Sequence, residues 1–155
     1  MNLTLLGHPD EAARIERQMP AYLKEMTQFE PEAEVTLTYP YLGHYWREPD
    51  RFPFIITNEG QDCGFALVRR IAPGDGTADY HAIAEFFIQP EFRRRGLGAA
   101  IVTEVLQQFP GKWLVQVLEL NQPARHFWQD TLDNISGQTL QPEFDGRFYN
   151  YWLEV

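Results

Sequence analysis

A basic run punctuated by two glycines is the part of this chain best suited to chemistry. Three consecutive arginines, Arg93 to Arg95, are followed by Gly96 and Gly98. Guanidinium groups are permanently charged and pair with phosphate oxygens through forked hydrogen bonds. Glycine has no Cβ, so an anion can approach the backbone closely and the turn can adopt dihedral angles closed to other residues. These residue types in this order are typical of a polyphosphate-binding site.

The segment after the arginines has the periodicity of a helix. Apolar residues recur at steps of three or four, which predicts a helix over 97–109. The first N–H groups of a helix have no partner within it, and the helix dipole adds partial positive charge there. We therefore expect the backbone at Leu97 and Ala99 to take part in anion binding. The alternative is a solvated arginine loop with a tight turn, but the order of strand, proline turn, basic glycine loop and helix favours the anion site.

Two other phosphate-binding motifs do not fit. A dinucleotide fingerprint needs a third glycine where Ile101 stands, and a Walker loop needs Ser or Thr where Trp113 follows Gly111-Lys112. The spacing of Arg93, Gly96 and Gly98 instead resembles the Arg-x-x-Gly-x-Gly/Ala signature of the GNAT N-acetyltransferase superfamily. In that family the loop holds the pyrophosphate of acetyl-coenzyme A, so the resemblance implies acetyl-CoA as the cosubstrate.

A second element supports the resemblance. Asn121-x-x-Ala124-x-x-Phe127-Trp128 is similar to the family's Asn-x-x-Ala-x-x-Phe-Tyr element, in which the asparagine and the helix face border the pantetheine arm. The resemblance also implies that backbone groups of Phe86, Phe87 and Ile88 pair with the pantetheine amide and polarise the acetyl carbonyl near a strand bulge. A fixed N–H aimed at a developing oxyanion contributes on the order of 3 kcal/mol.

Glu85 is the first candidate for a catalytic base. Transfer of an acetyl group to an amine requires the amine to lose a proton, since a free alkylamine has a pKa near 10. Glu85 interrupts an apolar strand beside the expected acetyl site, where desolvation would raise the pKa of its carboxyl group. The alternative is a solvent-facing or salt-bridged glutamate. His81, on the same segment, is the reserve base.

Trp128 departs from the family pattern. Many members carry a tyrosine there whose phenol protonates the departing thiolate, and an indole N–H is not a practical acid. We expect Tyr149, or else Tyr151 or water, to return the proton. Covalent catalysis has little support, because Cys63 lies in an apolar strand without a basic neighbour, so direct transfer is the simpler mechanism. No residue spacing indicates a metal site.

The elements that would position these residues follow from periodicity and turn signals. We expect strands over 3–6, 52–57, 63–69, 80–88 and 113–117, two short helices or one kinked helix between 8 and 26, an irregular aromatic stretch over 29–50, helices over 97–109 and 121–132, and a last hairpin over 139–144 and 148–153. The resemblance implies a mixed α/β (α+β) GNAT fold in a single domain over 1–155. Its mostly antiparallel seven-stranded sheet would be splayed between strands 4 and 5, with helices on both faces.

Composition limits the partners. The 155 residues are 44% hydrophobic and 14% aromatic, which indicates a globular domain, and the formal charge of −9 argues against nucleic acid. No apolar run approaches the roughly 20 residues that span a membrane. A lone cysteine and a start without secretion features favour the cytoplasm. We expect a small-molecule or peptide amine as acceptor, and dimers, common in this superfamily, are considered by analogy.

Three functional hypotheses remain open. The leading one is acetyl-CoA-dependent N-acetylation of a primary amine. The second is a non-catalytic GNAT-like module that binds acyl-CoA as a sensor, which the tryptophan at position 128 favours. The third is an enzyme of the same fold that uses a longer acyl donor.

Overall fold

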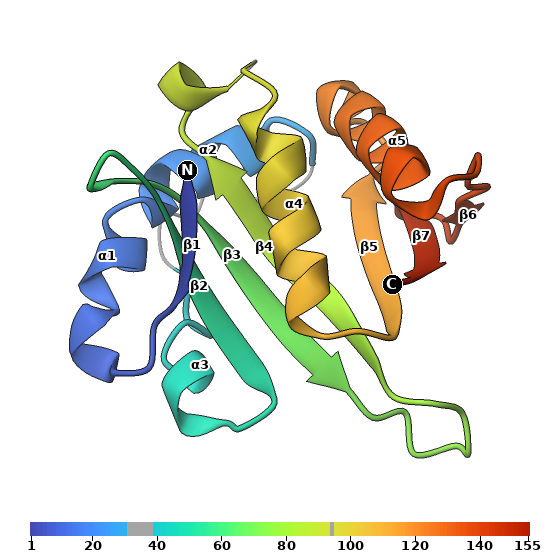
Figure 1. The fold of residues 1–155 in the computed structure, drawn as a ribbon, viewed down its shortest axis with the longest axis horizontal. Coiled ribbons are helices and arrows are strands. Elements are labelled where there is room, and N and C mark those ends of the chain that lie inside the picture. The colour runs from blue at the N-terminus through green and yellow to red at the C-terminus, as the bar shows by residue number, and fades with distance from the viewer. Residues whose placement is uncertain (31–38, 94) are drawn as a thin grey trace.

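A seven-stranded sheet forms the centre of the protein (Figure 1). The computed structural model describes residues 1–30, 39–93 and 95–155. The strand order is β1-β2-β3-β4-β5-β7-β6, with β4 and β5 parallel and the other neighbours antiparallel. The strands are β1 Asn2–Leu5, β2 Arg51–Asn58, β3 Gln61–Ile71, β4 Tyr80–Ile88, β5 Lys112–Leu118, β6 Glu143–Phe144 and β7 Phe148–Glu154.

Helices cover both faces of the sheet (Figure 1). On one face lie α4 Leu97–Gln108 and α5 Gln122–Ser136, over a core around Ile101, Trp113 and Leu132. On the other face lie α1 Ala13–Glu16, α2 Met19–Thr27 and α3 His44–Arg47, over a second core that contains Phe65 and Phe87. Two 3-10 turns, Pro9–Glu11 and Pro90–Phe92, precede α1 and α4. The predicted fold class is therefore confirmed.

The sheet opens between β4 and β5. The two strands pair only from His81 opposite Trp113 to Ile83 opposite Val115, although β4 continues to Ile88. A bulge also interrupts the pairing of β3 with β4, because Leu67 faces Glu85 while Val68 faces Ile83. The extra residue re-aims the side chains that follow it. The splay and the bulge thus fall at the same level of β4.

Three predicted elements differ from the structure. The stretch predicted to be irregular over 29–50 contains the single-turn helix α3, and α5 continues to Ser136, beyond the predicted end at 132. The predicted strand over 139–144 is reduced to the two residues of β6. Pro142 has no N–H to donate to a strand, and the Leu140 N–H donates instead to Asp133 Oδ1 on α5, at 2.8 Å. This segment therefore packs back onto α5.

Candidate functional site

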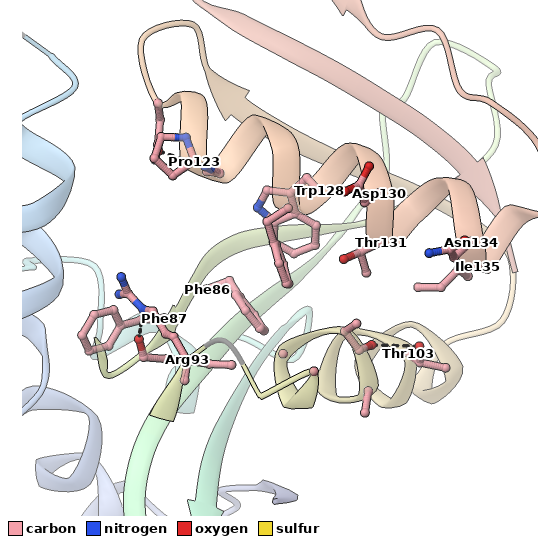
Figure 2. Close-up of a pocket in the computed structure, with 18 of the residues that line it drawn as sticks. Phe86, Phe87, Arg93, Thr103, Pro123, Trp128, Asp130, Thr131, Asn134 and Ile135 are labelled. Carbon is pink, nitrogen blue, oxygen red and sulfur yellow. Dashed lines mark hydrogen bonds between the residues drawn. The ribbon is translucent and has the colours of Figure 1, made fainter. Parts of the chain in front are cut away.

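A cavity of about 1090 Å³ lies where the sheet opens. It is bounded by α2, the end of β4, α4 and the inner face of α5, and Figure 2 shows Phe86 of β4 and Trp128 of α5 among the residues that line it. Most residues predicted to bind the cosubstrate line it: Phe86, Phe87, Ile88, Arg93, Gly96, Gly98, Ala99, Asn121, Ala124, Phe127 and Trp128. Arg95, Leu97, Glu85 and Tyr149 are not among its lining residues, and Arg94 lies outside the described residues.

The start of α4 has the backbone that the glycine motif predicts. Gly96 is the N-cap residue with φ of 71°, in the left-handed region that favours glycine. The helix N-terminus that follows opens on the cavity, where its unpaired N–H groups and dipole favour an anion. Gly98 has a different reason for lacking a side chain. A Cβ there would lie 3.1 Å from the Phe127 ring and 3.5 Å from Ile88 Cδ1, so this glycine makes room for an aromatic ring of α5.

Arg93 already has protein partners on the cavity wall. Its Nε donates to the Ile88 carbonyl at 2.6 Å, and its two terminal nitrogens donate to the Glu25 carboxylate at 2.9 and 2.7 Å. The guanidinium also lies 5.6 Å from the centre of the Phe87 ring, beside which Figure 2 draws it. Arg93 therefore ties α2 to the end of β4. Arg95 donates to the Glu91 carbonyl at 3.2 Å and lies exposed over the preceding turn.

The last residues of β4 present backbone groups to the gap. Gln89 donates its N–H to the Cys63 carbonyl on β3, at 2.8 Å. Because successive residues of a strand direct their N–H and C=O groups to opposite sides, those of Ile88 and Phe86 point toward β5. The bond from Arg93 to the Ile88 carbonyl agrees with this direction. Since β5 pairs with β4 only as far as Ile83, the N–H groups of Phe86 and Ile88 face the open part of the sheet.

Glu85 is a buried carboxyl group on the opposite face of β4. It stands across from Leu67, and the Tyr22 hydroxyl of α2 donates to its Oε2. Burial raises the pKa of Glu85 to about 6, against the lowering effect of hydrogen bonds from Tyr22 and Tyr39. The Glu30 carboxylate contributes a further rise. A carboxyl group with this pKa is largely ionised at neutral pH and can accept a proton.

The tyrosines around Glu85 stay protonated. Burial raises the pKa of Tyr22 well above its usual value, and the negative charge of Glu85 raises it further. Burial likewise raises the pKa of Tyr39 and brings that of Tyr45 to about 12. The phenols of Tyr22 and Tyr39 are therefore hydrogen-bond donors that orient the carboxylate, and Glu85 is the group of this cluster that titrates near neutral pH.

The other catalytic candidates have structural surroundings. Tyr149 lies on β7 with its ring 4.1 Å from the Arg125 guanidinium and 4.9 Å from the Phe144 ring. Tyr151 donates to Gln129 Oε1 at 3.0 Å. His81 stacks on Phe109, with ring centres 4.3 Å apart, on the face away from Glu85. None of the three lines the cavity.

Trp128 is 7% exposed and meets the Phe86 ring edge-on, with centres 5.3 Å apart. Asn121 caps α5, where its Oδ1 accepts the Ala124 N–H at 3.2 Å. The predicted element from 121 to 128 thus reaches the cavity along one helix face.

Sequence reasoning missed the wall that α2 contributes. Tyr22, Glu25 and Met26 of α2 line the cavity, together with Phe29 just beyond the end of the helix. In the sequence, the helical spacing of Tyr22 and Met26 indicates only a face directed inward. Thr103 and Thr131, which Figure 2 shows between α4 and α5, were also missed.

The described residues contain no group of three or more His, Cys, Asp or Glu side chains that could hold a metal ion. In the same ranges, no helix is long and apolar enough to cross a membrane.

Comparisons with known proteins agree with this geometry. The model of the acetyltransferase (GNAT) family matches residues 18–132. No curated protein matches the chain. Among solved structures, an acetyltransferase from Thermus thermophilus is 17% identical, with a TM-score of 0.73 over 100% of this chain and 98% of that one. A GNAT family acetyltransferase from Streptococcus agalactiae 2603 is 13% identical, with a TM-score of 0.75 over 99% and 95%.

A third solved structure is an aminoglycoside N-acetyltransferase, AAC(6')-Iy, in complex with CoA. It is 12% identical, with a TM-score of 0.59 over 84% of this chain and 89% of that one. At these identities the three structures share the fold with this chain.

Proposed function

The chain belongs to the acetyltransferase (GNAT) family, and we propose that it transfers the acetyl group of acetyl-CoA directly to a primary amine of a small molecule or protein. The observation that carries the proposal is the buried Glu85 carboxyl at the bulge of β4, with a pKa of about 6, beside the opening of the sheet. A base with this pKa accepts a proton from an amine near neutral pH.

The residues at the opening fit the cosubstrate. The N-terminus of α4 after Gly96 offers unpaired N–H groups for a diphosphate, and Phe86 and Ile88 offer backbone N–H groups along β4. The cavity continues beneath Asn121 and Trp128, where a pantetheine arm would lie. One related fold is known in complex with CoA. When bound, acetyl-CoA supplies an acetyl group as a thioester, whose C–S bond breaks as the amine forms a new C–N bond.

The chain's own residues handle the protons. Glu85 takes the proton of the amine, directly or through water, while Tyr22 and Tyr39 hold its carboxylate in one orientation. An N–H group of β4 that faces the gap can stabilise negative charge on a carbonyl oxygen. For the return of a proton to sulfur, Tyr149 stays a prediction. Because the Tyr149 ring packs against Arg125 and Phe144, water is the simpler donor, and a thiolate with a pKa near 8.5 leaves without a strong acid.

The test is release of free thiol from acetyl-CoA with a panel of amines, polyamines, amino acids and peptides. We expect turnover with at least one acceptor and a loss of about 100-fold or more in Glu85→Gln, the range of a general base. Glu104→Gln, an exposed change on α4, is the matched control and should leave the rate unaltered. Turnover that survives in Glu85→Gln at every pH would remove Glu85 from the mechanism.

A non-catalytic acyl-CoA sensor is the second candidate. It is favoured by Trp128, whose indole replaces the phenol found in many family members and packs against Phe86. Tight binding of CoA with no thiol release from any acceptor would select the sensor over the enzyme.

A further inference from the structure

Two buried polar atoms lack hydrogen-bond partners, and both lie on the Glu85 face of the sheet. Among the residues that the structure describes, they are the Tyr45 hydroxyl and the Nε of Arg69. Tyr45 is 3% exposed. A buried donor without an acceptor is costly, and native structures rarely contain one without a reason.

The strand register places Arg69 on the Glu85 face of the sheet. Leu67 stands directly opposite Glu85, and Arg69 follows two positions later on the same face of β3, opposite Ala82 and beyond the bulge of β4. The long side chain of an arginine can reach along this face toward the bulge. Tyr45 of α3 packs on the same face of the sheet, in the core that contains Leu67, and the charges of both Arg69 and Glu85 act on the pKa of its hydroxyl.

The charged neighbour of Arg69 is Arg51, whose positive charge is compensated by Glu48. Arg51 is its cross-strand partner on β2, and like charges in that position repel each other. Arg51 pairs with Glu48 and lies 5.3 Å from the centre of the Tyr45 ring. No ion pair or hydrogen bond joins Arg69 to any of the described residues. An anionic oxygen would both accept the hydrogen bond that the Nε of Arg69 does not make and compensate the charge of Arg69.

We propose that Arg69 and Tyr45 bind the carboxylate of an acceptor whose amine meets Glu85, so that the substrate is an amino carboxylate such as an amino acid. A carboxylate docked side-on to a guanidinium takes hydrogen bonds from Nε and one terminal nitrogen, which uses the unpartnered donor of Arg69. The Tyr45 hydroxyl supplies a third hydrogen bond. The proposal rests on the proposed function for the role of Glu85, while the carboxylate site itself depends only on Arg69 and Tyr45.

Binding and turnover are measured with matched pairs of acceptors. Phenylalanine is compared with phenethylamine, leucine with 3-methylbutylamine and lysine with cadaverine, and the 1-aminoalkylphosphonates serve as a second oxyanion. Calorimetric titration into the enzyme with CoA gives the affinity, and thiol release gives kcat/KM. We expect the protein to prefer the carboxylated member of at least one pair by about 30-fold or more, because a site built for a charged group rejects an analogue that lacks it.

Variants of three residues distinguish an Arg69 that binds the acceptor carboxylate from an Arg69 that only stabilises the fold. Arg69→Gln should reduce the preference to less than threefold, mainly through KM, with the affinity for CoA and the rate with the uncharged analogue preserved. Tyr45→Phe should reduce the preference by a smaller factor. Arg70→Gln is the matched control, because the adjacent Arg70 is exposed, points to the other face and pairs with Asp79 at 2.7 Å. It should leave the preference intact.

Three outcomes would overturn the proposal. One is an equal loss in Arg69→Gln for both members of a pair, a second is a wild-type protein that binds the decarboxylated amines as well as the amino acids, and a third is a preference for the phosphonates alone. Failure of the proposed function gives a different pattern. Amino acids would then still bind in an Arg69-dependent way while no acceptor releases thiol.

Discussion

The Tyr22 hydroxyl on α2 donates a hydrogen bond to the Glu85 carboxylate on β4, although the two residues are 63 positions apart in sequence. The contact joins a helix that lines the cavity to the bulge at the opening of the sheet. Because this hydrogen bond lowers the pKa of Glu85, the basicity of Glu85 depends on the position of α2.

Tyr22→Phe should raise the pKa of Glu85. The hydrogen bond from Tyr22 stabilises the ionised carboxylate and so holds the pKa down against the effect of burial. Its loss should move the acidic limb of the profile of kcat/KM against pH upward from about pH 6, by roughly one unit for a bond worth about 1.4 kcal/mol. Tyr41→Phe, at an exposed tyrosine, is the control. An unmoved limb would show that another group sets it.

Glu85→Gln should stabilise the fold at neutral pH. The pKa of Glu85 is raised from 4.5 to about 6 on folding, so the native state holds the proton more tightly than the unfolded state. This group's contribution to stability is complete below pH 4.5 and is lost as the pH rises through 6. The loss amounts to about 2 kcal/mol at most.

Urea unfolding at pH 4.5 and pH 7.5 measures that difference. The wild-type protein should lose free energy of unfolding over this interval relative to Glu85→Gln, because glutamine does not titrate. A parallel dependence on pH in both proteins would contradict a raised pKa for Glu85.

Glu25→Gln should strengthen the binding of CoA several-fold. The Glu25 carboxylate holds both terminal nitrogens of Arg93 beside the start of α4, so its neutralisation frees a guanidinium for phosphate and removes a negative charge from the cavity wall. The ion pair is about one-third exposed, so the effect on the free energy of unfolding should stay below about 1 kcal/mol.

Calorimetry with CoA at low and high salt measures the gain, and Glu16→Gln, on the exposed surface of α1, is a suitable control. If Arg93 serves only to hold α2, the affinity of Glu25→Gln will equal that of the wild type.

Gly64→Ala should impair catalysis more than binding. A Cβ at Gly64 on β3 would lie 2.2 Å from the Phe87 carbonyl oxygen and 3.1 Å from Ile88 Cα, so the β4 backbone must move. Misplacement of reacting groups by about 1 Å costs on the order of 100-fold in rate. We expect kcat to fall by that order, with a smaller change in the affinity for CoA. Ala66→Gly, two positions further along β3, tests whether a local change of the strand has the same effect.

The sequence predicted those parts of the site that are contiguous in the chain. Gly96 could be assigned because a helix stripe begins directly after it, and Glu85 because a carboxyl group interrupts an apolar strand. The partners of these residues come from other elements. Neither the contact of Tyr22 with Glu85 nor that of Glu25 with Arg93 has a local signal, since both contacts exist only once α2 packs on the sheet.

The sequence also explained only incompletely why position 98 is a glycine. A sequence argument assigns this glycine to the approach of an anion, yet in the folded protein its missing side chain accommodates Phe127 of α5. The two explanations predict different behaviour of the same variant, because a packing clash can be relieved from the other side and a blocked anion cannot.

Gly98→Ala should therefore weaken the affinity for CoA by displacing α5, and the double variant Gly98→Ala/Phe127→Leu should restore much of it. The added Cβ would lie 3.1 Å from the Phe127 ring, and α5 carries Asn121 and Trp128 on the same cavity wall. Replacement of the ring by a shorter side chain removes the clash and leaves the α4 backbone unchanged. Affinities of the two single variants and the double variant form a cycle whose coupling term measures the contact. Purely additive losses would instead assign Gly98 to the anion.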